Sequence, residues 1–165
     1  MPLTESQLET VAAFRAHIES VVKSDERYGH LTRHDRDDGS LLASRFEMAP
    51  KCWLELAVRP MIPQVRIGFV TTDRWKSEDA EGMIEDSGDS MPEFVGVGFN
   101  DAGLDWDEPP VEHFREAGEY FYFATPFDLD DVFDLNSDAT RDKTVRMLEG
   151  YLIAFGPAFE VEEEE

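Results

Sequence analysis

Near both ends of the chain, hydrophobic residues recur at intervals of three and four, which is the spacing of an amphipathic helix. Thr4 and Gln7 form a capping box before the first pattern, and Gly156 and Pro157 follow the second as a stop signal. We therefore expect one helix that starts after Thr4 and another over about 138–155. The apolar positions are Leu8, Val11, Phe14, Ile18 and Val21 in the first pattern, and Val145, Leu148, Leu152 and Phe155 in the second.

Between these helices, hydrophobic residues alternate with polar ones in three segments, 41–48, 52–59 and 64–69. Alternation with a period of two predicts half-buried strands, and the short connections that contain proline predict an antiparallel meander with one wet face. In this pattern Trp53 lies on the wet side of its strand.

The other segments have weaker signals. Residues 120–123, Tyr-Phe-Tyr-Phe, are the densest run of β-forming residues and predict a strand. The remaining expectations are a loop over 25–40, a short helix over 77–84, a strand over 94–99 and one or two helical turns over 111–117.

The order of these elements predicts one α+β domain over 1–159, in which an antiparallel sheet of about five strands has the N-terminal and C-terminal helices packed on it. Residues 160–165, Glu-Val-Glu-Glu-Glu-Glu, predict a disordered acidic tail.

The chain is strongly acidic, with 37 Asp and Glu against 15 Lys and Arg and a formal net charge of −22 over 165 residues. Such a field repels phosphate groups, so neither nucleic acid nor an anionic membrane is expected as a partner. The charge also fits simple solubility, a basic partner or a bound cation. Cys52 is the only cysteine, which excludes an intrachain disulfide. The first residues have neither a basic nor an apolar region, and no stretch approaches the ~18 apolar residues of a membrane span, so we expect no targeting segment and a cytoplasmic protein.

Two polar clusters could carry chemistry, but neither has the pattern of a known site. The pair His30 and His34, with carboxylates nearby, has the i and i+4 spacing of metal ligands, yet Gly29 and Gly39 on either side argue against a helix there. A solvated loop is the better interpretation. The second cluster surrounds His113 with carboxylates, which an acidic chain brings together by chance; it contains Asp101, Asp105, Asp107, Glu108 and Glu112.

The chain contains no nucleophile elbow, phosphate-binding loop or dinucleotide fingerprint. Cys52 lies in a predicted strand and reads as a buried thiol. We therefore predict no catalytic residues, no metal site and no cofactor.

The aromatic strand is more informative, because both of its faces need cover. Phe121 and Phe123 lie on one face, and Tyr120 and Tyr122 on the other. The two long helices can cover only one of these faces, so the other must pack internally or against a partner. Exposed aromatic clusters are typical of interaction surfaces. We therefore name Trp53, Tyr120 and Tyr122 as candidate partner-binding residues.

The order of elements, the size and the acidity of residues 3–155 resemble the type III secretion chaperone-like superfamily, whose members are small acidic proteins and usually homodimers. The resemblance implies a non-enzymatic binding protein that holds a segment of a partner against its surface, and it implies a protein partner or self-association as a homodimer. The alternative is a protein, possibly an enzyme, that binds a small molecule or a divalent cation through its acidic loops.

Overall fold

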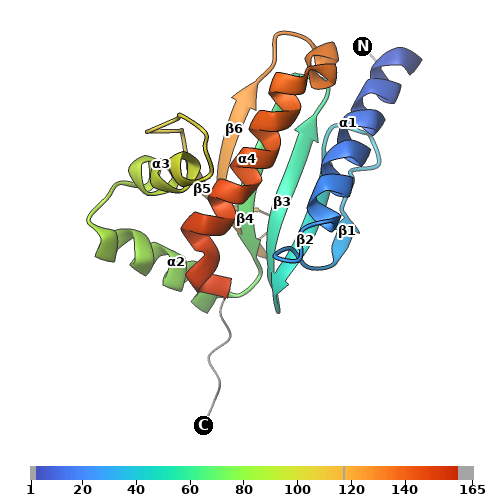
Figure 1. The fold of residues 1–165 in the computed structure, drawn as a ribbon. Helices are drawn as coiled ribbons and strands as arrows, with labels where there is room; N and C mark the ends of the chain where they lie inside the picture. Colours follow the sequence, from blue (N-terminus) through green and yellow to red (C-terminus); the bar gives the residue numbers. More distant parts are fainter. Residues whose placement is uncertain (1–2, 117, 160–165) are drawn as a thin grey trace.

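In the computed structural model, which describes residues 3–116 and 118–159, the chain folds into a single antiparallel sheet with helices on one face (Figure 1). The helices are α1 (Glu5–Lys23), α2 (Arg74–Ser87), α3 (Met91–Asp101) and α4 (Asp138–Phe155), with short 3₁₀ helices η1 (Val132–Asn136) and η2 (Gly156–Phe159). The strands are β1 (Leu31–Arg33), β2 (Leu42–Ala49), β3 (Cys52–Arg59), β4 (Gln64–Thr71), β5 (Glu112–Glu116) and β6 (Tyr120–Asp128).

The α+β class is confirmed, and the sheet has six strands in the order β1-β2-β3-β4-β6-β5, with every neighbouring pair antiparallel. The predicted meander forms β2, β3 and β4. The strand predicted over 120–123 lies in β6, which pairs with β4 so that Phe123 stands opposite Phe69. The acidic tail predicted over 160–165 lies outside the described residues.

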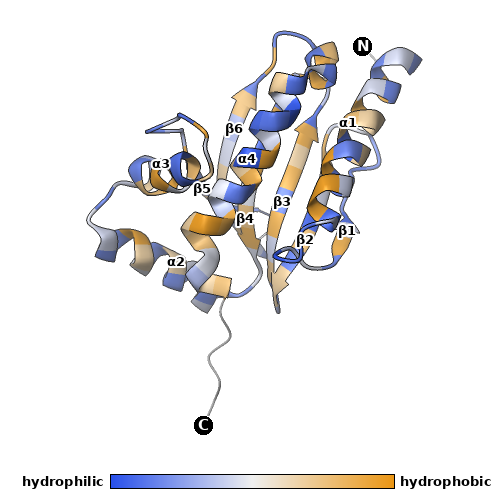
Figure 2. Ribbon diagram, in the orientation of Figure 1, coloured by the Kyte–Doolittle hydropathy of each residue, from blue (hydrophilic) through white to orange (hydrophobic). Residues whose placement is uncertain are grey.

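The hydrophobic core lies between the sheet and the two long helices, α1 and α4, which run across the same face (Figure 1). Figure 2 shows orange bands on these two helices and along β3 and β4. The capping box of Thr4 and Gln7 starts α1 as predicted. Leu8 is wrongly placed in the predicted stripe, because it is 52% exposed.

The strand predicted over 94–99 is wrong, because these residues belong to α3. Val95 and Phe99, four positions apart, are both buried, whereas Val97 is exposed. Ser90 and Glu93 form a capping box that begins this helix. The two glycines between the apolar residues imitate the alternation of a strand, but their lack of a side chain allows the helix to pack closely against its neighbours.

The helical turns predicted over 111–117 are also wrong. Residues 112–116 form the edge strand β5, which pairs with β6 over its whole length. The short helix predicted over 77–84 is longer at both ends and becomes α2, and the loop predicted over 25–40 contains the three-residue strand β1.

The sheet curls toward the face that carries no helix. Strands β1 and β5 are its opposite edges, and in a flat sheet of six strands about 4.8 Å apart they would lie about 24 Å from one another. Yet Arg36, shortly after β1, donates from Nη2 to Oε1 of Glu116 on β5 at 3.0 Å. The curl therefore turns the helix-free face inward and brings side chains from distant strands together.

Candidate functional site

The helix-free face of the sheet has a floor of small buried residues and long polar side chains that lie on it. Because side chains alternate along a strand, the neighbours of the core residues in β2, β3, β4 and β6 point to this face. Ala57 lies next to Ala43 in the register, and Gly68 lies next to Ala124. A Cβ at Gly68 would come within 3.0 Å of the Cβ of Ala124. The floor therefore leaves room for long side chains above it.

Four buried side chains fill this room and form a polar network: Arg45, Glu55, Arg66 and Tyr122. Arg45 Nε donates to Glu55 Oε2 at 2.9 Å, and its Nη2 donates to the hydroxyl of Tyr122 at 2.9 Å. That hydroxyl donates in turn to Glu55 Oε2 at 3.3 Å. Arg66 Nη2 reaches Glu55 Oε1 at 3.4 Å. The four side chains come from β2, β3, β4 and β6, so the network joins the centre of the sheet.

Arg66 is the exceptional member of this network. It is only 2% exposed, and among the described residues its Nε is the one buried side-chain nitrogen or oxygen without a hydrogen-bond partner. A buried donor that lacks an acceptor costs about 1–3 kcal/mol, and more when the group is charged. The network also contains two guanidinium groups and a single carboxylate, and uncompensated charge in an interior is costly. Nε of Arg66 is therefore short of one hydrogen-bond acceptor.

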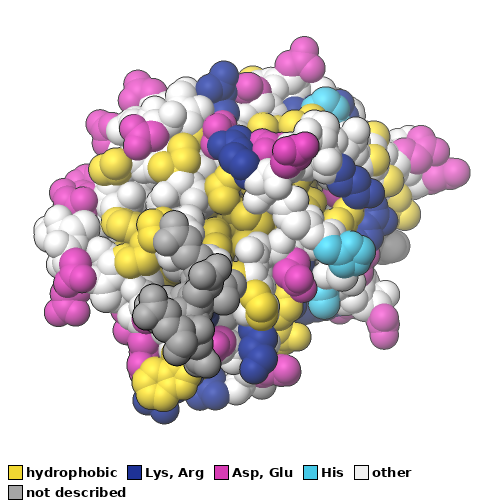
Figure 3. All heavy atoms as spheres, turned by 60° about the horizontal axis from the view of Figure 1, so that its bottom comes forward, with side chains coloured by type: hydrophobic (Ala, Val, Ile, Leu, Met, Phe, Trp, Pro, Cys, Tyr) yellow, Lys and Arg dark blue, Asp and Glu magenta, His cyan; other side chains and the backbone are white. Residues whose placement is uncertain are grey.

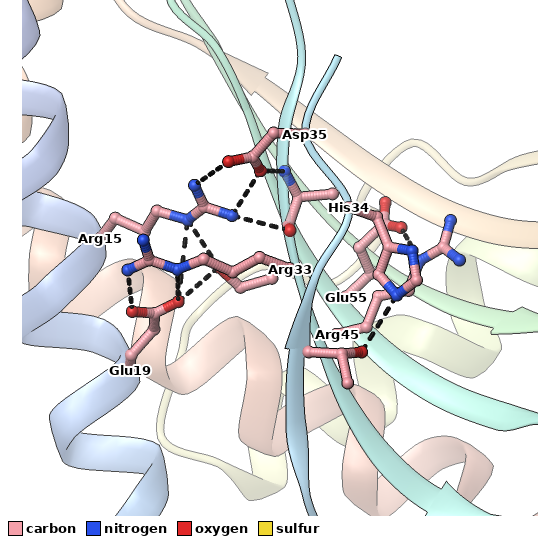
Figure 4. A network of polar contacts seen from close by, with 10 residues as sticks. Arg15, Glu19, Arg33, His34, Asp35, Arg45 and Glu55 are labelled. Carbon is pink, nitrogen blue, oxygen red and sulfur yellow. Dashed lines mark hydrogen bonds and ion pairs between the residues drawn. The ribbon is translucent and has the colours of Figure 1, made fainter. Parts of the chain in front are cut away.

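Two basic groups beside the network are affected by burial and by its guanidinium charges. Burial, together with the nearby charge of Arg66, lowers the pKa of Arg59 at the end of β3. Burial and the charge of Arg45 likewise lower the pKa of His34. Figure 4 shows His34 beside Glu55 and Arg45. Carboxylates also lie near these groups, because the charges of Glu112 and Glu116 act on Arg59 in the opposite sense.

Aromatic side chains stand at the rim of this face, and two of them are predicted site residues. Trp53 and Tyr120 are partly exposed, and the guanidinium carbon of Arg45 lies 5.9 Å and 4.5 Å from their ring centres. Tyr122, the third predicted residue, is 1% exposed, and Phe114 of β5 stacks on it at 4.8 Å. The sheet itself therefore covers Tyr122, whereas Trp53 and Tyr120 remain accessible.

The sequence analysis missed Arg45, Glu55, Arg66 and Phe114. The first three occupy polar positions of an alternating pattern, which normally face water. The signal that could have found them is the run of small residues, Ala57, Gly68 and Ala124, in the middle of three strands.

A second polar network ties α1 to the sheet edge on the opposite face. Arg15 donates from Nη1 and Nη2 to Asp35 at 2.8 Å and 2.6 Å, and from Nε to Ser44 at 2.8 Å. These hydrogen bonds hold the pKa of Asp35 below its usual value. Burial works to raise the pKa of Glu19, but hydrogen bonds from Arg33 and Ser44 outweigh it and lower that pKa. Every charge here has a partner, so this network serves to hold α1 in place (Figure 4).

The structure does not bring the two polar clusters of the sequence together. Asp35 points to Arg15 on α1, whereas its neighbour His34 points to the other side of the strands (Figure 4). Nε2 of His113 is hydrogen-bonded to Glu81 on α2 at 2.8 Å. Glu112, which precedes His113 in β5, faces the opposite side of the sheet. Within residues 3–116 and 118–159, no group of three or more His, Cys, Asp or Glu side chains could hold a metal ion.

A surface hollow of about 840 Å³ lies where the β2–β3 turn, α2 and η2 meet, at the end of the molecule turned forward in Figure 3. Its walls mix acidic and basic side chains, among them Asp73, Asp79, Asp86 and Lys51. Figure 3 shows acidic side chains spread around this view. Cys52, near this end, is a buried thiol whose pKa is raised by burial.

Comparisons of the chain with protein-family models, with curated proteins and with solved structures found no match. Across the described ranges, none of the helices has the length and apolar composition that crossing a membrane requires.

Proposed function

We propose that this chain is a non-enzymatic, chaperone-like binding protein that holds an extended segment of a partner protein on the helix-free face of its sheet. The observation that carries the proposal is the buried network of Arg45, Glu55, Arg66 and Tyr122 beneath partly exposed aromatic residues. Aromatic and arginine side chains are the types that contribute most to protein interfaces. A sheet face that served only the fold would be simpler to fill with apolar side chains.

The shape of the sheet favours an extended segment that lies across its face. The central strands have eight or nine residues, a length of about 27 Å, and Trp53 and Tyr120 remain accessible at the rim of the face that they form. Addition of a strand at an edge is disfavoured on both sides. The edge strand β1 has only three residues, and β5 carries charges at Glu112, Arg115 and Glu116.

The roles of the three predicted residues differ in this proposal. Trp53 and Tyr120, which are partly exposed, contact the partner directly. Tyr122 is buried, and its hydroxyl holds Arg45 and Glu55 in position. A chaperone-like role is also what the resemblance to the type III secretion chaperone-like superfamily implies. Membership of that superfamily, a cytoplasmic location and the homodimer stay predictions.

The test is selection of random 12-residue peptides displayed on phage against the purified protein, followed by affinity measurements on variants. We expect Trp53→Ala and Tyr120→Ala each to weaken binding of the selected peptides by about tenfold or more. Trp75→Ala is the matched control, because Trp75 is 72% exposed and lies on α2, away from this face.

Selected peptides that bind equally well to the Trp53 and Tyr120 variants would contradict the proposal. A second copy of the chain is the other occupant that the face could take. Light scattering of the protein alone, at low and high salt, measures whether the mass exceeds the monomer value of 18.8 kDa. A dimer that the Tyr120→Ala change dissociates would show that the face binds a second copy instead.

A further inference from the structure

The guanidinium of Arg66, whose Nε has no hydrogen-bond partner, lies beside two aromatic rings. The guanidinium carbon is 5.2 Å from the ring centre of Tyr122 and 5.5 Å from that of Phe114. One of its nitrogens, Nη2, makes a long contact of 3.4 Å with Glu55, whereas Nε has no acceptor at all. The side chain is therefore fixed by aromatic rings and by one weak ion pair, with a donor left over.

Within the buried network, Arg66 shares its one carboxylate partner with Arg45. Glu55 is shared between Arg45, at 2.9 Å, and Arg66, at 3.4 Å, so the stronger contact goes to Arg45. Arg59 adds a further positive charge close enough to Arg66 to respond to it. A bound anion would supply the acceptor that Nε lacks, in a charge-assisted hydrogen bond.

We propose that Arg66, with Arg59 beside it, forms a subsite for a single carboxylate, which is the side chain of an Asp or Glu residue in the bound partner segment. The inference rests on the proposed function and adds what the face recognises. Arg66 donates from Nε to one carboxylate oxygen, and Arg59 contributes positive charge at the outer side.

The donor set suits a carboxylate better than a phosphate. Nε of Arg66 is buried without an acceptor and Nη2 already contacts Glu55, so the buried part of the guanidinium offers one donor, a poor match for a group that has three acceptor oxygens. Glu55 lies 3.4 Å from the same guanidinium. Its negative charge repels a ligand that carries two negative charges more strongly than a ligand that carries one. Both points favour a ligand with one charge.

A carboxylate reaches Arg66 only when a covering side chain moves. Phe114 belongs to the edge strand β5 and is partly exposed, so its ring is the one that must leave its stack on Tyr122 and turn outward. The contact between Arg36 and Glu116, which bridges the two edges of the sheet, is also on the surface. Exposed ion pairs of this kind contribute little to stability, so opening there is accessible.

The experiment observes the Nε–Hε group of Arg66 directly by nitrogen–proton NMR, with the resonance assigned through its side-chain carbons and checked by its loss in Arg66→Lys. The probe is N-acetylglutamic acid α-amide, and the matched control is N-acetylglutamine amide, which has the same shape without the charge. Sodium chloride keeps the ionic strength equal in all samples.

We expect the carboxylate probe to shift the Arg66 resonance in a saturable manner, with half-saturation in the millimolar range, and the neutral control to leave it unchanged. Arg59→Gln should raise the half-saturation concentration by about threefold or more. No saturable shift with the carboxylate overturns the proposal. A larger, tighter response to inorganic phosphate overturns the choice of carboxylate.

The outcomes separate this inference from the proposed function. Selected peptides that need Trp53 and Tyr120 but bind equally well without any acidic residue would refute the subsite and leave the function standing. A saturable Arg66 shift with the small probe, in a protein that selects no peptide for this face, would support the subsite and refute the function. If Arg66→Lys does not fold, the Arg59→Gln comparison still decides the case.

Discussion

Glu55 shows how a single residue supports the helix-free face. It accepts hydrogen bonds from Arg45, Arg66 and Tyr122, and it is 1% exposed. It is also the one carboxylate within the network, so the two guanidinium groups depend on it. Loss of one partner from a buried ion pair is more damaging than replacement of the whole pair, because the remaining charge is left without compensation.

We therefore predict that Glu55→Gln lowers the free energy of unfolding by about 3 kcal/mol. Urea unfolding followed by circular dichroism measures this change. Glu47→Gln is the matched control, since Glu47 is an exposed glutamate on the same face, opposite Trp53, and should change stability by less than about 0.5 kcal/mol. A Glu55→Gln variant as stable as the control would show that the network contributes nothing to the fold.

On the other side of the sheet, the contact of Asp35 with Arg15 makes the stability of the fold depend on pH. Its pKa is lowered by hydrogen bonds from Arg15, so the ionised form is favoured in the folded protein. A lowered pKa stabilises the fold above the unfolded value of about 3.9, and this contribution is lost as the pH falls through the folded pKa. We expect Asp35→Asn to be less stable than the wild type at pH 7, with a difference that shrinks below about pH 4.

Thermal melting of both proteins between pH 7 and pH 2 checks this expectation. Asp37→Asn, in the same exposed loop, is the control and should follow the wild type throughout. An Asp35→Asn variant whose difference from the wild type is constant over this range would contradict the ionic origin of the effect.

At the scale of elements, contact between α3 and α4 depends on glycine. A Cβ at Gly98 would overlap with the backbone oxygen of Gly150, and one at Gly150 would overlap with the ring of Phe99. We predict that Gly98→Ala destabilises the protein by about 2 kcal/mol, although alanine is the better helix former.

Gly82→Ala in α2 is the matched control for this prediction. A Cβ at Gly82 meets nothing within 4 Å, so alanine there should stabilise the protein by up to about 1 kcal/mol. Chemical denaturation of the two variants measures both signs. A stabilising Gly98→Ala would mean that the two helices do not approach as closely as the structure shows.

The same glycines explain where sequence reasoning succeeded and failed. The helices near the two ends and the meander have clear periods, and the structure confirms them. In 94–99, glycine at Gly96 and Gly98 imitated a period of two, although the capping box of Ser90 and Glu93 was present in the sequence. The polar network could not be predicted, because the burial of Arg45 and Arg66 comes from the curl of the sheet and from strands distant in sequence.

At the scale of the whole molecule, the net charge of −22 opposes the compact state. Most acidic side chains are at the surface, where the Debye length falls from about 30 Å at 0.01 M salt to about 3 Å at 1 M. We therefore predict that the melting temperature rises between these two sodium chloride concentrations. A lower melting temperature at high salt would mean that exposed ion pairs stabilise the fold more than self-repulsion weakens it.

The central claim is that a partner segment lies on the helix-free face, and the fluorescence of Trp53 tests it most directly. The protein has three tryptophans, so the double variant Trp75→Phe, Trp106→Phe reports on Trp53 alone, and Trp53→Phe, Trp106→Phe reports on Trp75 alone. Titration with a peptide selected as described above should change the emission of the first variant in a saturable manner and leave the second unchanged. Saturable binding that alters Trp75 and leaves Trp53 unchanged would contradict the claim.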